Sequence, residues 1–291
     1  MKRGIDHLVL AVRDLDAAID AYHTFGFTTT PRALHPWGTA NSLVQLQGNF
    51  LELLEIAEPE KIEPAGPDAF SFGAFNQDFL EKREGFSMLV FESDDARRDR
   101  QDFADKGLTT YAPFDFSRQA TLPDGSTATV AFSLAFVTDD RMPDAAFFVC
   151  QQHAPEYFWK PDFQQHANGA RRISEVVMVA ERPETLAEHF AKLQGSENVS
   201  SSEGGLSIET ARGRVTVLTP ERFGERFPLE TGHPSRDGPH FAGFQVEVAA
   251  LSEVETVLDR RGVQAQKTGE ALHIASENAF GVAVEFIGPD G

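Results

Sequence analysis

Two residues of this chain combine a reactive side chain with an apolar surrounding. His7 lies in the run GIDHLVLAV at residues 4–12, and Glu52 lies in the run FLELLE at residues 50–55. A buried carboxylate is costly unless it is paired, protonated or bound to a metal, which points to a function for Glu52; Glu55 is the alternative inward acid, since a three-residue step changes the face of a strand. The plain alternative for His7 is a buried, hydrogen-bonded core histidine. We expect both residues to face a cleft as a catalytic pair, in which a neutral imidazole takes a proton near pH 7 while a carboxylate orients it.

Four further polar or aromatic residues are candidates for substrate binding. His153 and Trp159 lie in the segment QQHAPEYFWK, whose aromatic cluster suits a planar or apolar ligand or simply covers the end of a sheet. Arg118 follows FDFS and can hold a carboxylate with two hydrogen bonds, or form an ordinary surface ion pair. Asn41 can hydrogen-bond a substrate or cap a turn.

Composition excludes several classes of function. The net charge of the 291 residues is −19, and a binding surface for nucleic acid or an anionic membrane needs the opposite sign. No apolar run is long enough to span a bilayer, and no signal-peptide core follows Met1. The single cysteine, Cys150, excludes an internal disulfide and reads as an inert buried thiol. We expect a cytoplasmic protein, and no phosphate loop indicates a nucleotide cofactor.

An internal repeat fixes the architecture that must position these residues. The run GIDHLVLAV leads to a glycine at position 26, and the run GFSMLVFE, which begins at Gly85, leads to Gly107 at the same spacing. This repeat aligns His7 with Met88 without a gap. Each copy reads as a strand, a helix that ends at the closing glycine, and further strands.

Two weaker copies follow, beginning at Ile173 and near Gly243. Four βαβββ modules predict an α+β fold in which the modules pair into two eight-stranded half-barrels, each with a cleft. We expect one domain at residues 1–170 and a second, degenerate one at 171–291. Three segments are expected to be irregular: a loop at 112–118, a turn at Pro123-Asp124-Gly125, and a linker at 220–239.

These modules resemble the vicinal oxygen chelate superfamily, which includes glyoxalase I, fosfomycin-resistance proteins, methylmalonyl-CoA epimerase and extradiol dioxygenases. The openings GIDHLVLAV and closings FLELLE carry the resemblance, and the stretch HPWGTAN at residues 35–41 is similar to the glyoxalase-like subfamily. The resemblance specifies the fold and leaves the reaction open, because members run isomerisation, epimerisation, thiol transfer and dioxygenation on one scaffold.

The resemblance implies a divalent metal in the cleft, held by a histidine of a first strand and a glutamate of a last strand. His7 and Glu52 match these two positions. Nitrogen and carboxylate ligands suit Fe, Mn, Ni, Co or Zn. Such a metal would bind two neighbouring oxygens of the substrate and stabilise an enediolate or another developing oxyanion.

The second module departs from this pattern. Met88 stands where a second histidine would lie, and the last strand reads FVCQQH, which offers Cys150 or Gln151 opposite Glu52. His153 follows directly. The expected metal set is therefore His7, Glu52 and the atypical third ligand His153.

The second half of the chain departs further. Glu175 stands near the position of His7, and the fourth module offers Phe244 or Gln245 there. Glu285 matches Glu52. These residues read as remnants of a lost second site or as ion-paired surface groups.

The sequence thus predicts a metal-dependent enzyme of lyase, isomerase or dioxygenase type that acts on a small oxygen-bearing molecule in the first cleft. The alternative is a metal-free protein that binds and sequesters a small molecule. No nucleic-acid or membrane partner is expected. The second half-barrel would be structural or mediate formation of a homodimer.

Overall fold

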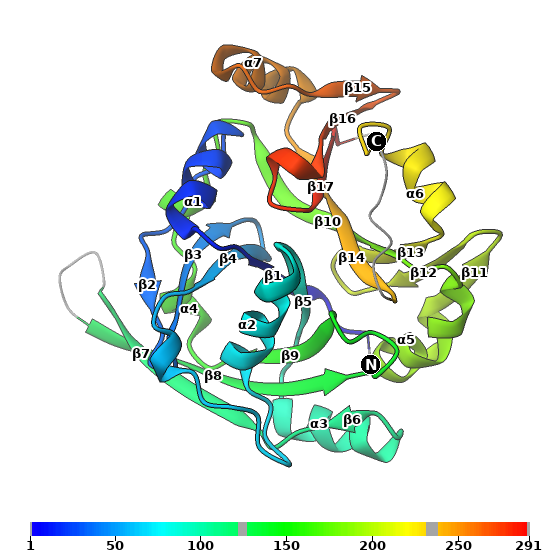
Figure 1. The fold of residues 1–291 in the computed structure, drawn as a ribbon. Helices are drawn as coiled ribbons and strands as arrows, with labels where there is room; N and C mark the ends of the chain where they lie inside the picture. The colour runs from blue at the N-terminus through cyan, green and yellow to red at the C-terminus, as the bar shows by residue number, and fades with distance from the viewer. Residues whose placement is uncertain (1, 122–126, 231–237, 290–291) are drawn as a thin grey trace.

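The computed structural model describes residues 2–121, 127–230 and 238–289 and arranges them in two mixed β-sheets with helices around them (Figure 1). In the described residues the first sheet has the strand order β2-β3-β4-β1-β5-β9-β8-β6, and β7 pairs with β8 off this path. Its strands are β1 (Ile5–Ala11), β2 (Ala33–Leu34), β3 (Thr39–Gln45), β4 (Phe50–Ile56), β5 (Gly85–Glu92), β6 (Thr109–Thr110), β7 (Phe114–Thr121), β8 (Thr127–Thr138) and β9 (Ala146–Gln152).

The second sheet repeats this arrangement with the order β11-β12-β13-β10-β14-β17-β16-β15. In both sheets the first strands of two modules lie antiparallel at the centre, and each pairs in parallel with the last strand of its own module. Its strands are β10 (Ala170–Val179), β11 (Val199–Ser202), β12 (Gly205–Glu209), β13 (Arg214–Leu218), β14 (His240–Val248), β15 (Gln266–Thr268), β16 (Ala271–Ile274) and β17 (Ala283–Ile287).

Helices follow the first strand of each module, as the repeat predicts. Asp14 and Asp95 cap the first helices of modules one and two, each accepting a hydrogen bond from the backbone N–H three residues on. The helices are α1 (Leu15–Thr24), α2 (Phe72–Lys82), α3 (Ala96–Asp105), α4 (Pro155–Phe158), α5 (Ala187–Gln194), α6 (Pro220–Arg226) and α7 (Leu251–Arg261), with 3₁₀ turns at η1 (Pro59–Lys61), η2 (Pro161–Gln164), η3 (Pro183–Leu186), η4 (Ser196–Asn198) and η5 (Ser276–Asn278).

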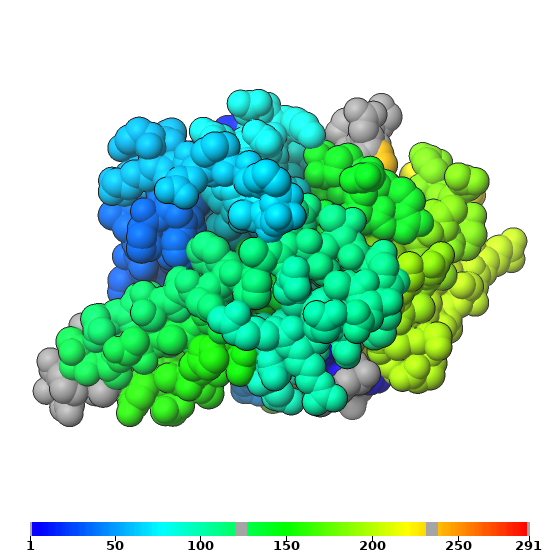
Figure 2. All heavy atoms as spheres, turned by 90° about the horizontal axis from the view of Figure 1, so that it is seen from below, coloured from blue at the N-terminus to red at the C-terminus, as the bar shows by residue number. Residues whose placement is uncertain are grey.

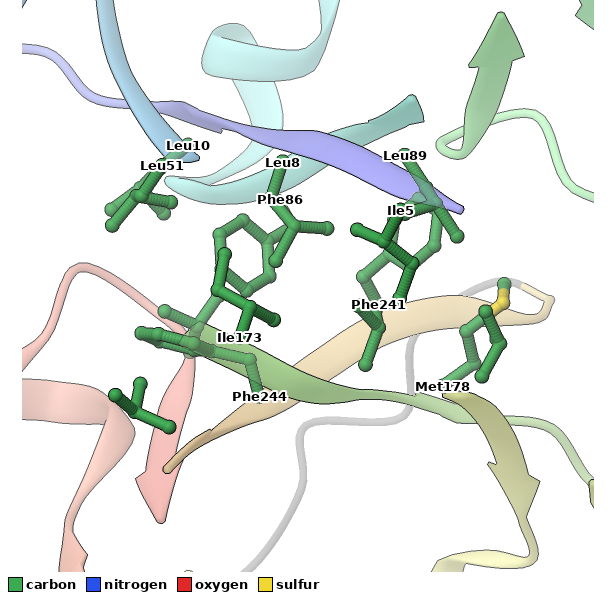
Figure 3. Close-up of a cluster of buried hydrophobic side chains, with 14 of the residues drawn as sticks. Ile5, Leu8, Leu10, Leu51, Phe86, Leu89, Ile173, Met178, Phe241 and Phe244 are labelled. Carbon is green, nitrogen blue, oxygen red and sulfur yellow. The ribbon is translucent and has the colours of Figure 1, made fainter. Parts of the chain in front are cut away.

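The two sheets pack against each other through one face of each. Figure 3 shows Leu8 and Phe86 of the first sheet pointing toward Ile173 and Phe244 of the second. The Phe86 and Phe244 rings meet edge to face with centroids 5.2 Å apart, and both side chains are buried. One hydrophobic core therefore joins both halves of the chain.

The opposite face of each sheet carries a separate cluster, because side chains of a strand alternate between faces. On the first sheet this cluster, which includes Val9, Phe50 and Phe148, lines what we call the first cup. On the second sheet the cluster of Val177, Val179, Phe223, Phe227, Ala242 and Ala283 fills what we call the second cup. In Figure 2 the β7–β8 hairpin, coloured green, projects at the lower left of the molecule.

A β-bulge in each central strand relates the four modules. The β1–β5 register skips one residue of β1 between Ile5 and His7 and one of β5 between Met88 and Phe86. The β10–β14 register slips in the same way in both strands. A bulge adds one unpaired residue and re-aims the adjacent side chains. The bulged pairs are Asp6–His7, Ser87–Met88, Ser174–Glu175 and Ala242–Gly243.

These bulges confirm the expected equivalence of Met88 with His7 and correct the one expected for module four. Glu175 stands at the position of His7, as expected, but in module four Gly243 stands there rather than Phe244 or Gln245. Sequence alone did not locate the extra residue of each bulge, and one skipped residue shifts the alignment.

The last strands are aligned by the same registers. Glu52 pairs with the residue two after His7, and Glu285 pairs with the residue two after Gly243, which confirms their equivalence. In module two this place belongs to Phe148, so the expected alignment of Cys150 or Gln151 with Glu52 was wrong.

Two segments expected to be irregular form regular structure. Residues 114–118 of the expected loop belong to β7, which pairs with β8 over its whole length. Helix α6 lies in the expected linker, with Thr219 as its N-cap and Pro220 in its first turn. The turn Pro123-Asp124-Gly125 lies outside the described residues.

None of the helices in the described part of the chain has both the length and the apolar character needed to cross a membrane.

Candidate functional site

The first cup holds a narrow cavity of about 70 Å³ between α2 and strands of the first sheet. Aromatic rings make most of its wall, and polar groups gather at the floor. Its residues are His7, His35, Trp37, Asn41, Leu43, Phe50, Glu52, Phe72, Phe114, Phe116, Arg118, Phe132, Leu134, Phe148, Cys150 and Phe158. The structure thus brings together four of the predicted site residues, namely His7, Asn41, Glu52 and Arg118.

The bulge in β1 sets the orientation of His7. Regular alternation would place Asp6 and His7 on opposite faces, but here Asp6 Oδ1 lies 2.5 Å from His7 Nδ1. The other carboxylate oxygen of Asp6 accepts a hydrogen bond from Gln152 Nε2 at 2.9 Å. The His7 ring stacks on Phe50 with centroids 4.2 Å apart. Asp6 therefore engages Nδ1 of the ring, and the other ring nitrogen, Nε2, lies toward Glu52.

Glu52 is the acid of β4 that faces the cavity. Its Oε2 lies 3.8 Å from His7 Nε2, and its Oε1 accepts a hydrogen bond from Asn41 Nδ2 at 2.6 Å. The same Asn41 nitrogen lies 3.3 Å from His35 Nε2. Glu55 serves a different purpose, because its Oε2 accepts from the backbone N–H of Leu15 at the start of α1.

His35 is a functional candidate that was not among the residues predicted from the sequence, although the stretch HPWGTAN contains it. Its Nδ1 lies 2.8 Å from Thr39 Oγ1, and its ring stacks on Trp37 with centroids 4.7 Å apart. Burial lowers the pKa of His35, with the Glu52 charge acting in the opposite direction, so the ring is neutral near pH 7.

Arg118 brings a positive charge to the cavity from β7. Burial lowers the pKa of Arg118, and the Glu52 carboxylate opposes this shift. Among the described residues no carboxylate lies within ion-pair distance of its guanidinium, and the buried Trp37 Nε1–H also has no hydrogen-bond acceptor. Arg118 therefore gives the cavity a charged donor for a ligand oxygen.

His153 and Trp159 do not line this cavity. Phe148 is level with His7 across β5, and His153 follows five residues later, which is about 16 Å further along the strand. His153 Nε2 instead lies 2.8 Å from Ser133 Oγ. Trp159 packs its ring against Phe50 from outside, with centroids 5.8 Å apart.

The expected three-ligand metal site does not fit this geometry. His7 Nε2 and Glu52 Oε2 form a donor pair, but His153 is too far away to complete it. Among the described residues no three His, Cys, Asp or Glu side chains are grouped so that they could hold a metal ion. Catalytic zinc sites ordinarily use three protein ligands, so the pair of His7 and Glu52 is one protein ligand short of such a site.

Cys150 occupies the wall between this cavity and a second, polar hollow that includes Asp6. Burial raises the pKa of the Cys150 thiol, and the negative charges of Asp6 and Glu52 raise it further. The thiol is thus protonated near neutral pH and is a poor nucleophile.

Comparison with solved structures supports the fold. A hypothetical protein from Staphylococcus aureus is 13% identical, with a TM-score of 0.67 over 98% of this chain and 99% of its own. A variant of 4-hydroxymandelate synthase from Streptomyces coelicolor is 12% identical, with a TM-score of 0.58 over 100% and 93%. The 2,2',3-trihydroxybiphenyl 1,2-dioxygenase of Sphingomonas wittichii is 11% identical, with a TM-score of 0.55 over 99% and 91%.

Comparison with curated proteins found no relative. The sequence profile of the glyoxalase-like domain, in contrast, matches residues 5–194, which include both central strands of the first sheet. The module order and paired sheets agree with the vicinal oxygen chelate fold of the structural neighbours. The chain therefore belongs to the glyoxalase-like domain family and has the vicinal oxygen chelate fold.

Proposed function

We propose that the first cup binds a small, flat, oxygen-bearing molecule and that His7 moves one of its protons. The observation that supports this most is the Asp6–His7 pair, joined at 2.5 Å, at the floor of an aromatic cavity. Asp6 holds the ring so that Nε2 faces the cavity and Glu52. A histidine oriented in this way by a carboxylate is a suitable general base.

The cavity wall favours a particular class of ligand. Its phenylalanines suit a planar or apolar body, and Arg118 suits a carboxylate or an enolate oxygen. We therefore propose an aryl or alkyl 2-oxo acid, or a compound of similar shape. Removal of a proton next to the carbonyl transfers it to His7 Nε2 and leaves an enolate, whose negative charge Arg118 stabilises. Return of the same proton to another atom of the substrate completes an isomerisation, in which the substrate gains and loses no atoms.

A metal-dependent enzyme of lyase, isomerase or dioxygenase type is the second candidate. It is favoured by the 3.8 Å separation of His7 Nε2 and Glu52 Oε2, at the two positions that the superfamily uses for ligands. Such a site would need a further donor from the substrate or solvent. Sequestration without turnover is the third candidate, and the same cavity supports it.

Exchange of substrate protons with solvent tests the role of His7. Phenylpyruvate is a suitable probe, because NMR in D₂O follows the loss of its C3 protons without a coupled assay. We expect wild type to accelerate this exchange. The rate of exchange with H7A should be about 10²–10⁴-fold lower than the rate with wild type. R118M should weaken binding of the probe, whereas R97A, which removes a surface arginine paired with Asp115, should not. Equal exchange with wild type and H7A would contradict the proposal.

Metal analysis separates the first two candidates. Wild type and H7A are purified without chelator and analysed for first-row metals. Stoichiometric metal in wild type that is absent from H7A would favour the metal-dependent enzyme over the metal-free base. Retained binding of the probe without exchange would instead favour sequestration.

Two expectations concern the whole protein rather than the site. We propose a cytoplasmic location, on the basis of the single buried cysteine, and a role for the second half of the chain in structure or in a homodimer. Both stay predictions.

A further inference from the structure

The second cup contains a buried charge cluster that the proposed function does not use. Helix α6 lies across this cup and inserts Phe223 and Phe227, whose rings stack with centroids 4.6 Å apart and are almost completely buried. Arg226, the last residue of α6, points to the same place. The second cup is thus filled by a helix of the chain itself, whereas the first cup contains a cavity.

The Arg226 guanidinium lies between two buried carboxylates. Its Nη1 donates to Glu175 Oε1 at 2.7 Å and its Nη2 to Glu175 Oε2 at 3.2 Å. On the other side Nη2 donates to Glu285 Oε2 at 2.5 Å and Nε to Glu285 Oε1 at 3.2 Å. Both carboxylates are engaged through both oxygens, which is the geometry that a planar guanidinium uniquely matches.

The surrounding groups complete this setting. Gln245 Nε2 donates to Glu285 Oε2 at 2.6 Å, and Arg214 Nη2 donates to Glu175 Oε2 at 2.7 Å. His273 pairs with Glu285 across β16 and β17 and is buried, and its Nδ1 has no hydrogen-bond partner among the residues that the structure describes. Burial lowers the pKa of His273, so this neighbour is neutral near pH 7.

The two carboxylates occupy positions that the fold repeats. Glu175 is the bulged residue of β10, where β1 has His7, and Glu285 stands where β4 has Glu52. The same backbone geometry therefore aims two polar groups at the centre of each cup. In the first cup they face a cavity, and in the second they face Arg226.

We propose that the second cup is a binding site for a guanidinium cation and that Arg226 occupies it in cis, which closes this cup to ligands from solution. The class of ligand follows from the four donor contacts and from the Phe227 ring, whose centroid lies 5.3 Å from the guanidinium carbon. The inference is independent of the chemistry of the first cup. It predicts that a small guanidinium compound enters the second cup when the Arg226 side chain is removed.

Chemical rescue tests this proposal. We expect R226A to melt roughly 5–10 °C below wild type, because two buried carboxylates lose their counterion. Methylguanidinium at about 10 mM should raise the melting temperature of R226A by about 3 °C more than that of wild type, which corresponds to a Kd near 1 mM. Tetramethylammonium at the same concentration carries the charge without N–H donors and should give no such difference.

The helix also provides a matched control. Arg222 lies on α6 and pairs with the exposed Glu225, so R222A removes an arginine of the same helix that does not enter the cup. Methylguanidinium should not stabilise R222A relative to wild type. Equal shifts for R226A, R222A and wild type would overturn the proposal. So would stabilisation of R226A by Zn²⁺ and not by methylguanidinium, since that would indicate a metal site built on His273 and the two carboxylates.

A second variant covers the case in which R226A does not fold. R226Q keeps a planar amide donor beside the carboxylates but removes the charge. It should show the same selective response to methylguanidinium, and E285Q added to R226Q should abolish it. A response that persists in R226Q/E285Q would contradict binding between Glu175 and Glu285.

Discussion

At the scale of single residues, Asp6, His7 and Glu52 form one group at the first cup, in which Asp6 Oδ1 lies 2.5 Å from His7 Nδ1 and Glu52 Oε2 lies 3.8 Å from His7 Nε2. His7 and Glu52 could be predicted because each interrupts an apolar strand, where an ionisable side chain needs a reason. Asp6 was missed, because strand alternation assigns it to the opposite face, and the bulge that overrides alternation depends on pairing with β5. His153 was misplaced for a related reason, since only the strand register shows how far along β9 it lies.

Cys150 offers a test of the charges around this centre. The free thiol is buried, and both burial and the carboxylates of Asp6 and Glu52 raise its pKa. We expect Ellman's reagent to modify native protein at pH 8 at least about 100-fold more slowly than protein unfolded in urea. The C150S variant contains no cysteine and therefore serves as the blank. Rapid modification of native protein would show that the thiol is accessible and ionised.

At the scale of elements, the repeat predicted the strands and helices that open and close each module. Helix α6 and strand β7 were missed although their sequences carry signals. Thr219 and Pro220 form a regular helix start, but the surrounding prolines and glycines favoured a linker. In β7 the alternation of Phe114 and Phe116 with polar residues is typical of a strand, yet the segment is short of apolar residues beyond them. Pairing with β8, the next strand along the chain, stabilises β7, and filling of the second cup stabilises α6.

Helix α2, which covers the first cup, is held at its C-terminal end by a buried carboxylate. Asp144 accepts hydrogen bonds from Lys82 at 2.7 Å and Arg83 at 2.6 Å. Burial raises the pKa of Asp144, but these two bonds outweigh burial and lower it below its ordinary value of 3.8. A lowered pKa in the folded state contributes stability above the unfolded pKa and loses it as pH falls through the folded one.

We therefore expect D144N to lower the free energy of unfolding by about 1–3 kcal/mol at pH 7. The difference from wild type should narrow as pH falls below 3.8, because the unfolded chain then binds a proton at Asp144 while the folded chain binds it only at a lower pH. Urea denaturation at pH 7, 5 and 3.5 measures both effects. D115N, which breaks an exposed pair with Arg97, should change stability little at any of these pH values. A pH-independent difference for D144N would mean that its charge does not stabilise the fold.

At the scale of the whole molecule, sequence predicted two half-barrels but not how they meet. Composition and periodicity show that both faces of each sheet are apolar, and they do not show which face meets the other sheet. The structure assigns one face to a shared core, in which Phe86 contacts Phe244 (Figure 3). The division into domains at residues 1–170 and 171–291 therefore stays a prediction from the sequence repeat. The shared core, in contrast, leads us to expect that the two halves unfold as a single cooperative unit.

The position of the tryptophans makes this cooperativity measurable. Trp37 and Trp159 are the two tryptophans of the chain, so their fluorescence reports only the first sheet, while far-UV circular dichroism reports both. We expect F244A, a change in the second sheet, to cost about 3–5 kcal/mol, because it leaves a cavity in the shared core. The urea midpoints of its fluorescence and circular-dichroism transitions should both be lower than those of wild type, and by the same amount. L34A, at a side chain that is 61% exposed, should move neither by more than about 0.5 kcal/mol. A fluorescence transition that stays in place while dichroism divides into two steps would mean that the halves fold independently.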